Sequence, residues 1–530
     1  MTAIKNYLKE QSAPKSVSTK VREDQVENNT GGFVFKTSDE QRLTRFLVLG
    51  TDKGTYYATE RDLTSQSVDF IIDFIKRDEA TVRETVVDVS ANARAPKNSS
   101  ALFVLALLFV YGEDKAMATD ALLDVARTGT HLFEFVSYLK GLGGLGKAKR
   151  RAIGAWYLNK NVDRLGMQVA KYRSRYGYTH RDLLRLCHVK GLDQSVGEFI
   201  LNGKVTEDAP GILHAFEEAQ AVTSAAEAVK VIKRYPLVPW EFFPTEVHKS
   251  KDFWKAIFET GTMGQTALLR NVTRFAKLGL FDDVKFAGDV AKALSDPEAI
   301  KRGRLHPVQY LNALGIYSNG TFERGGYGRS SVPYAVNAKI SGALEKGFYA
   351  AFANVEPSGK RTMVSLDVSG SMTWEAPAGL VGINAMEAAA AMAMVTVRTE
   401  DYVEVNAFSS DLQKVDISDS DSLYDVNRKL NRLGFGCTNI AAPIEQALSK
   451  RQVIDTFIIY TDNEVNSGRH AYQVLDEYRR KVNPQARLVI VGMTVTNFTV
   501  ARPDDPLSLD VVGFDAAAPG VIADFSAGRL

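Results

Sequence analysis

The sequence predicts a multidomain protein in which a long all-α region of helical repeats is followed by a doubly wound α/β domain. The first observation is a change of pattern at the Pro-Ser-Gly of 357–359. Before it, apolar runs have helical spacing, and after it apolar strands alternate with helices. The second is a change of charge: residues 361–530 hold 15 Lys or Arg against 22 Asp or Glu, whereas the whole chain has a net charge of +2. Because the two changes coincide, we place a domain boundary near residue 357.

Composition narrows the class of protein. The 530 residues are 45% hydrophobic, enough for the cores of several domains. The first residues are polar and lack the apolar stretch of a signal peptide, and the longest apolar run, 101–111, is too short to cross a bilayer. The two cysteines give no disulfide framework. We therefore expect a cytoplasmic, monomeric protein without a membrane partner, and a buried helix at 101–111.

The N-terminal two thirds are predicted to be helical. Residues 1–20 are expected to be flexible and 21–356 to form the helical domain, with helices at 42–50, 65–77, 81–93, 99–111, 116–128, 131–140, 194–201, 211–234, 246–260, 265–278, 281–294, 307–314 and 333–353. Short linkers without a heptad repeat favour stacked helix pairs. The segment 141–146 matches the dinucleotide pattern G-x-G-x-x-G, but it follows a helical pattern and not a strand, so we interpret it as a helix connector.

Positive charge is concentrated between Lys147 and Lys190. This stretch holds twelve Lys or Arg against two acidic residues. We expect an amphipathic helix over 163–176, a turn at Gly177, and a second helix that begins at the capping box of Thr179 and Asp182. A face of one charge repels itself unless a polyanion binds to it, so RNA or DNA binding is favoured over a merely solvated surface.

Candidate nucleic-acid contacts lie on the outer sides of these two helices. The predicted RNA-binding residues are Lys171, Arg175, His188, Arg164, Arg173, His180, Arg181 and Arg185. Interleaved flat side chains offer surfaces for base stacking: Trp156, Tyr157, Tyr172, Tyr176, Tyr178, His180 and His188.

The C-terminal region, 361–530, reads as alternating strands and helices. Strands are predicted at 363–368, 402–408, 456–460 and 488–495, and helices at 382–398, 440–449 and 471–481. Buried strands separated by helices indicate a mostly parallel, doubly wound, Rossmann-like sheet.

Oxygen-bearing side chains follow the strands of this domain. Asp367, Ser369 and Ser371 come directly after the first strand, Thr438 precedes a helix, and Asp462 follows a later strand. Ligands bind at this edge of open α/β sheets. Carboxylate and hydroxyl oxygens suit a hard divalent cation, Mg²⁺ in particular. A lone D-x-S-x-S also arises from local turn preferences, but three such loops in this order form a more specific pattern.

The three loops resemble the metal-ion-dependent adhesion site of von Willebrand factor A domains. That resemblance implies that Asp367, Ser369, Ser371, Thr438 and Asp462 are the metal ligands, directly or through water, and that a partner's carboxylate fills the open position. The Gly-Cys-Thr-Asn of 436–439 departs from the second Gly that A domains often carry there.

The whole chain resembles the Ro ribonucleoprotein family, of the bacterial type. The resemblance rests on Asn28-Asn29-Thr30-Gly31-Gly32-Phe33, Arg42-Leu43-Thr44-Arg45-Phe46-Leu47, Gly54-Thr55-Tyr56-Tyr57 and Lys171-Tyr172-Arg173-Ser174-Arg175. It implies a TROVE module whose HEAT-like repeats close into a ring, followed by the A domain. It also implies that Y RNAs bind the outer basic surface, where Lys171, Arg175 and His188 match, and that single-stranded 3′ ends of misfolded or structured RNAs enter the hole during noncoding RNA quality control.

The resemblance implies a non-enzymatic protein with RNA partners. The expected protein partner is an exoribonuclease or another protein that presents an Asp or Glu to the metal site. Two alternatives remain: a protein-interaction scaffold that uses the A domain, and a metal-dependent nuclease. The nuclease lacks a clear nucleophile, because only Glu464 adds a carboxylate near Asp367 and Asp462, and adjacent Cys187 and His188 point about 100° apart on a helix.

Overall fold

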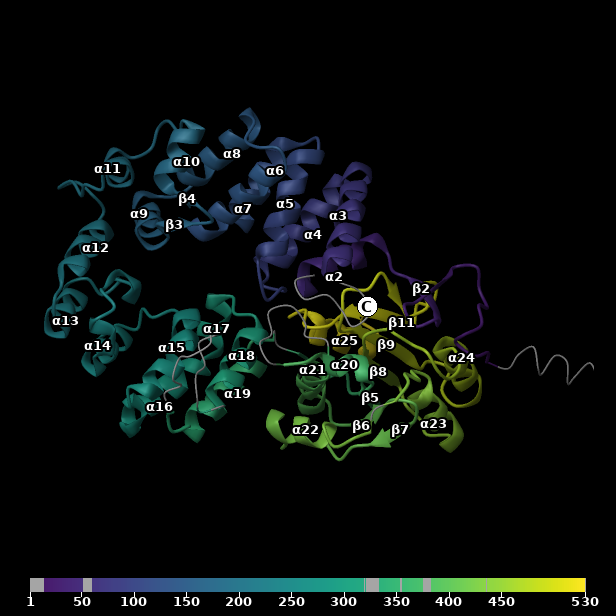
Figure 1. Cartoon of the computed structure of the whole chain (residues 1–530). Helices are drawn as coiled ribbons and strands as arrows, with labels where there is room; N and C mark the ends of the chain where they lie inside the picture. The colour runs from purple at the N-terminus through teal and green to yellow at the C-terminus, as the bar shows by residue number, and fades with distance from the viewer. Residues whose placement is uncertain are drawn as a thin grey trace, which may run out of the picture. The chain divides into compact units, whose positions relative to one another are not determined.

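The computed structural model of the chain describes residues 14–50, 60–318, 320, 333–352, 355–374, 383–434 and 436–529, which form two compact units (Figure 1). One unit, made of residues 71–93 and 98–351, is helical. The other combines residues 1–70, 94–97 and 352–530 around a mostly parallel sheet. The predicted succession of an all-α region and a doubly wound α/β domain is confirmed. None of the helices described is both long and apolar enough to cross a membrane.

Helices of the helical unit stack on one another along the chain. Helix α4 (Glu79–Ala91) packs on α6 (Lys115–Val125), and α5 (Ser99–Tyr111) packs on α7 (Gly129–Gly141). Such contacts between helices two apart in order are typical of stacked helix pairs. The helices that follow are α8 (Lys147–Leu158), α9 (Val162–Lys171), α10 (His180–Cys187), α11 (Gln194–Asn202), α12 (Gly211–Ala221), α13 (Ala225–Arg234), α14 (Lys251–Glu259), α15 (Gln265–Lys277), α16 (Val284–Leu294), α17 (Pro297–Gly303), α18 (Pro307–Ser318) and α19 (Ala338–Ala350). Closure of the repeats into a ring stays a prediction.

Two local predictions in this unit are confirmed. Helix α5 has the bounds that the sequence predicts, and its residues from Ala101 to Phe109 are buried with the exception of Phe103. The glycine-rich segment 141–146 connects α7 to α8, so it follows directly on a helix and not on a strand. Gly143 and Gly144 have φ angles of +106° and +90°, which L side chains avoid. The glycines therefore serve a turn between helices.

Two predicted helices are interrupted. The helix expected over 163–176 ends at Lys171, because Tyr176 and Gly177 both adopt positive φ angles, 54° and 77°, and form the turn of a short hairpin. The helix expected over 211–234 divides into α12 and α13, because the Ser224 hydroxyl accepts a hydrogen bond from the backbone N–H of Glu227 and starts a new helix. In both segments local turn and capping chemistry interrupts a continuous apolar periodicity.

The α/β unit contains a six-stranded sheet with the order β11-β9-β8-β5-β6-β7. Its strands are β5 (Thr362–Asp367), β6 (Val403–Phe408), β7 (Leu412–Lys414), β8 (Thr456–Thr461), β9 (Arg487–Gly492) and β11 (Ser508–Val512). All neighbours are parallel except β6 and β7. The strand order reverses between β5 and β8, which is where ligands bind in doubly wound sheets.

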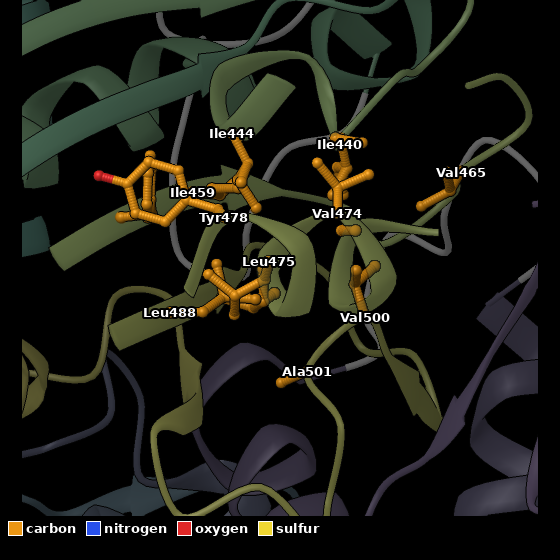
Figure 2. Packing of buried hydrophobic residues seen from close by; sticks show 14 of the residues in the cluster. Ile440, Ile444, Ile459, Val465, Val474, Leu475, Tyr478, Leu488, Val500 and Ala501 are labelled. Atoms are coloured by element: carbon orange, nitrogen blue, oxygen red, sulfur yellow. The ribbon is translucent and has the colours of Figure 1, made fainter. Parts of the chain in front are cut away.

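Helices cover this sheet. They are α20 (Gly370–Trp374), α21 (Ala385–Thr399), α22 (Leu423–Leu430), α23 (Ala442–Lys450), α24 (Ala471–Lys481) and α25 (Ala518–Ala527). Figure 2 shows Ile444 of α23 and Leu475 of α24 in the same buried cluster as Leu488 of β9. The fully buried strands explain why the sequence reads as continuous apolar runs here.

The N-terminal segment belongs to the α/β unit. Strands β1 (Gln25–Glu27), β2 (Phe33–Lys36) and β10 (Phe498–Thr499) form a small antiparallel sheet. Val17 is buried in the same core cluster as Ile440, and its backbone N–H donates to the carbonyl of Gly468 over 3.1 Å. The expectation of a flexible segment over 1–20 is therefore wrong for residues 14–20, because they pack on the C-terminal region; residues 1–13 lie outside the described part of the chain.

A buried ion pair joins this N-terminal segment to the main sheet. Arg45 of α2 (Asp39–Leu49) is fully buried, and its guanidinium donates to both oxygens of Asp510 on β11 over 2.6 and 2.8 Å. The same guanidinium donates to the carbonyls of Thr496 and Phe498 over 2.8 and 2.7 Å. Burial raises the pKa of Asp510. The arginine therefore satisfies several buried acceptors at once.

We expect Arg45→Met to destabilise the α/β unit strongly, because it leaves the Asp510 carboxylate buried without its counter-charge and removes the guanidinium donors from the carbonyls of Thr496 and Phe498. Removing one member of a buried pair costs about 3–5 kcal/mol. Chemical denaturation followed by fluorescence measures the loss. Arg22→Ala is the matched control, since Arg22 pairs with Asp24 near the surface, and such pairs contribute about 1 kcal/mol or less. Equal effects of the two variants would contradict this role for Arg45.

Candidate cation site and basic surface

The predicted metal-binding loops meet at one edge of the sheet. In the parallel register of β5 and β8, Leu366 lies opposite Tyr460, so the ends of the two strands are level. Asp367 ends β5, and Asp462 follows β8 by one residue. The structure therefore brings these two carboxylates to the point where the strand order reverses.

Asp367 is fully buried and held by two donors. One carboxylate oxygen accepts the backbone N–H of Ser369 over 2.9 Å, and the other accepts the hydroxyl of Thr461 over 2.7 Å. The hydroxyl oxygens of Ser369 and Ser371 lie 3.2 Å apart. Three predicted ligands therefore converge within one loop.

Asp462 is also fully buried, but its two oxygens differ. One oxygen, Oδ1, accepts the backbone N–H of Glu464 over 2.9 Å. The other, Oδ2, has no hydrogen bond of standard geometry among the residues that the structure describes, although the nearby Ser371 hydroxyl partly offsets the rise that burial causes in the pKa of Asp462. A buried carboxylate oxygen without a donor is costly unless a cation satisfies it.

Thr438 is buried and hydrogen-bonded to the loop that carries Asp462. Its backbone N–H donates to the side chain of Asn466 over 2.8 Å, and its carbonyl accepts the N–H groups of Asn466 and Ser467. The next residue, Asn439, donates its N–H to the carbonyl of Ser409, at the end of β6. The Thr438 loop is thus fixed to two neighbouring strand ends.

The electrostatics of the site favour a cation. Burial raises the pKa of both Asp367 and Asp462, and the charge of Asp462 raises that of Asp367 further. Two buried carboxylates with neutral hydroxyls around them fit a hard divalent cation that keeps some of its waters. Within the described ranges, no group of three or more His, Cys, Asp or Glu gathers as a metal site.

The structure adds a residue whose position the sequence did not predict. Glu464 is buried, and burial raises its pKa to about 8. Its carboxylate accepts two hydrogen bonds from Asn29, one from the backbone N–H over 3.1 Å and one from the side-chain amide over 2.5 Å. The sequence showed an acidic residue near Asp462, but nothing in it indicated a partner so far away in the chain.

The basic surface lies on α9, α10 and the hairpin between them. Strands β3 (Ser174–Arg175) and β4 (Tyr178–Thr179) form this hairpin, so Arg175 lies on a strand and not four residues along a helix from Lys171. The second helix begins with the predicted capping box of Thr179 and Asp182. Its inner side buries Leu183 and Leu184.

The arginines of this surface carry an excess of charge. Five are exposed, and none of them forms an ion pair with another described residue: Arg164, Arg173, Arg175, Arg181 and Arg185. Arg173 lies over the ring of Phe216, 5.4 Å from its centre, beside a cavity of about 780 Å³ that Arg181 also lines. His188 is exposed at the C-terminus of α10.

Lys171 differs from these arginines. Its ammonium forms an ion pair with Glu241 over 3.2 Å, and only 25% of its side chain is exposed. The sequence gave no sign of this pair, because the two residues lie on separate elements. The ammonium of Lys171 must therefore break its ion pair with Glu241 before it binds an anion.

His180 is not on the exposed face, contrary to the sequence-based prediction. Its ring is buried against Phe133 and Trp156, and its Nδ1 shares a hydrogen bond of 2.8 Å with the Tyr157 hydroxyl. Trp156 and Tyr157 are fully buried too, so these three side chains cannot stack on bases. His180 is the first residue of α10, and its side chain turns into the core rather than along the basic face.

Known proteins resemble the chain over nearly its whole length. The family model described as the TROVE domain matches residues 26–238 and 212–319, and that of the Ro60 vWA domain matches residues 361–526. The RNA-binding protein RO60 of Deinococcus radiodurans is 39% identical over 520 residues, or 96% of each chain. The RNA-binding protein RO60 of Caenorhabditis elegans is 31% identical over 597 residues, covering 96% of this chain and 91% of that one.

A solved structure agrees with these matches. The crystal structure of the Deinococcus radiodurans RO (RSR) protein superposes with a TM-score of 0.69 at 38% identity. The superposition covers 93% of this chain and 100% of that one.

We expect the stability of the helical unit to fall in acid because of two histidines, His180, which is buried, and His131, which is half-buried. Burial lowers the pKa of His131 and of His180 to about 4. An unfolded histidine titrates near 6.5, so protons favour the unfolded chain as the pH falls from about 6.5 towards 4, by up to roughly 3 kcal/mol per group. Denaturation midpoints at pH 7 and pH 5 measure this loss. His180→Gln, which keeps an acceptor for Tyr157 but does not titrate, should show a smaller pH dependence, and an unchanged one would contradict the assignment.

Proposed function

Because the chain belongs to the Ro60 family of RNA-binding proteins, we propose that its basic surface binds small noncoding Y RNAs and that the protein acts in noncoding RNA quality control. The observation that carries the proposal is the group of five exposed arginines that form no ion pair within the described chain, on α9, α10 and the hairpin between them. Guanidinium groups bind phosphates in pairs of hydrogen bonds, and a surface of one charge attracts a polyanion.

We assign the central contacts to Lys171, Arg175 and His188, which match the Y RNA positions of the family. Arg175 lies on the exposed edge of the hairpin, and His188 ends α10 with a left-handed backbone, φ 52°. An exposed imidazole there is free to stack on a base or to donate a hydrogen bond. His180, by contrast, supports this surface from beneath and takes no part in contact.

We also propose that the cation site serves protein contact. Asp367 and Asp462 would provide the negative charge, and Ser369, Ser371 and Thr438 the neutral oxygens. The bound Mg²⁺ would supply an electrophilic position for the Asp or Glu of a partner such as an exoribonuclease. The buried Oδ2 of Asp462, which has no hydrogen bond of standard geometry within the described chain, supports a cation there.

A binding role is favoured over a catalytic one. A nuclease would use a further carboxylate at the cation, but Glu464, two residues after Asp462, already accepts two hydrogen bonds from Asn29. Cys187 is no better candidate, because burial raises the pKa of its thiol to about 11. Cytoplasmic location and a monomeric state stay predictions from the sequence.

We expect the combined variant Lys171→Ala, Arg175→Ala and His188→Ser to weaken RNA binding at least about tenfold, because hydrogen bonds to charged groups contribute about 1.5–3 kcal/mol each. The slope of log K against log salt should become shallower by about 0.9 for each lost phosphate contact on a duplex. Filter binding at several salt concentrations measures both.

Two single variants give this measurement its controls. Glu241→Gln should raise the affinity, since it frees Lys171 and removes a negative charge beside the surface. Lys233→Ala removes an exposed cation on α13 and should leave the affinity unchanged. A triple variant that binds like the wild type, or a weaker Glu241→Gln, would show that the basic face is only a solvated surface.

We expect RNAs with a single-stranded 3′ tail to compete better than blunt duplexes of the same sequence. The prediction rests on the family's ring, whose hole admits a strand and excludes a duplex by its diameter. Competition between the two RNAs for a labelled Y RNA-like hairpin measures the difference. Equal competition would remove the hole from the proposal and leave surface binding.

We expect Asp367→Ala to abolish cation binding while RNA affinity stays at the wild-type value, because the two sites lie in different compact units. Calorimetry with Mg²⁺ or Mn²⁺ measures the first quantity, and fluorescence anisotropy with RNA the second. A wild-type protein that binds no cation, or an RNA affinity that falls with Asp367, would contradict this division.

A further inference from the structure

A turn near the N-terminus packs directly on the loop that carries Asp462. We call residues Asn28–Gly32 the N-terminal turn. The Asn28 amide donates to the carbonyl of Val465 over 2.9 Å and to that of Asn463 over 3.4 Å. Its own oxygen accepts the backbone N–H of Gly32 over 2.7 Å, which closes the turn. A segment more than 400 residues away in sequence thus binds the backbone of the metal loop.

Side chains continue this connection to the predicted ligand. The Asn29 amide and backbone N–H both donate to the carboxylate of Glu464, at 2.5 and 3.1 Å. The backbone N–H of Glu464 donates in turn to Oδ1 of Asp462 over 2.9 Å. Two hydrogen-bonded steps therefore join Asn29 to the carboxylate whose other oxygen is buried without a hydrogen bond of standard geometry in the described chain.

The contact leaves little room for adjustment. A Cβ added to Gly32 would lie 2.0 Å from the carbonyl oxygen of Val465, so no larger residue fits. Val465 is buried in the core cluster that also holds Ile440, Val474 and Val500 (Figure 2). In the loop that carries Asp462, the next residue, Asn463, adopts a positive φ of 67°. The turn and the metal loop are therefore fixed against each other in one arrangement.

We propose that Asn29 is a positioning residue of the cation site: it holds Glu464, and through the Glu464 backbone it orients the Asp462 carboxylate for the cation. The inference rests on the proposed cation site. Hydrogen-bond partners of metal ligands fix the orientation of those ligands, and their loss weakens metal affinity about 10–100-fold. The N-terminal turn thereby becomes a part of a site whose ligands all lie in the last third of the chain.

The test compares full-length variants by calorimetry with Mg²⁺ or Mn²⁺, alongside denaturation without cation. Asn29→Ala should raise the cation Kd about tenfold. Asn29→Asp should raise it further, because a second carboxylate then faces Glu464. Thr30→Val is the matched control: it removes hydrogen bonds from the Thr30 hydroxyl to Asn28 and Val465 in the same turn, but does not touch Glu464.

Thr30→Val should lower the stability without cation and leave the cation Kd unchanged. A double-mutant cycle with Glu464→Gln tests whether Asn29 acts through Glu464. In the Glu464→Gln background, Asn29→Ala should have little further effect on the cation Kd. An unchanged Kd in a folded Asn29→Ala protein would overturn the proposal, as would equal changes in Asn29→Ala and Thr30→Val. If the wild type binds no cation, the proposed cation site itself is wrong. If the wild type binds a cation and the Asn29 variants bind it with the same Kd, the cation site stands and the positioning role of Asn29 is wrong.

Discussion

The α/β unit depends on the buried contact between Arg45 and Asp510. Two opposite charges without access to water stabilise a fold only when hydrogen bonds replace most of their lost hydration. Here the two terminal nitrogens of the guanidinium bind Asp510 and the carbonyls of Thr496 and Phe498, while Nε has no partner among the described residues. The contact fixes α2 against β11, and the small sheet of β1, β2 and β10 joins the same two regions. The α/β unit of this chain is therefore assembled from both ends of the sequence.

The same joining of distant segments shapes the two candidate sites. The proposed cation site would take its ligands from strand ends that the parallel sheet brings level, and the N-terminal turn hydrogen-bonds to the loop that carries Asp462. The basic surface takes its arginines from one continuous segment, but Glu241, from a different element, holds Lys171. In each site, the residues proposed to bind the ligand are close in sequence or aligned by strand register. The residues that contact them, Asn29 in one site and Glu241 in the other, come from distant parts of the chain.

This difference explains how much could be predicted. Strand and helix patterns and the loops at strand ends gave the α/β fold and the meeting of Asp367 with Asp462, because periodicity and sheet topology are local rules. Charge density gave the basic surface. Periodicity did not show that Tyr176 and Gly177 would turn the chain, or that His180, at the first position of α10, would point inward. Nor could any local pattern pair Asn29 with Glu464 or Arg45 with Asp510, since these partners are brought together only by the finished packing.

The division of the α/β unit between the two ends of the chain also sets the order in which the protein can be completed during synthesis. Arg45 and β2 leave the ribosome early, whereas Phe498, whose carbonyl Arg45 binds, is 453 residues further on. At about 5–20 residues per second, the first segment waits roughly 20–90 s for its partners. During that interval the edge of β2 that later pairs with β10 is open, while β1 pairs with the other edge, and Arg45 lacks Asp510, so the helical unit is free to fold first. The nascent chain thus has an exposed strand edge on β2 until β10 is synthesised. During this period the edge is most accessible to incorrect strand pairing and to chaperones.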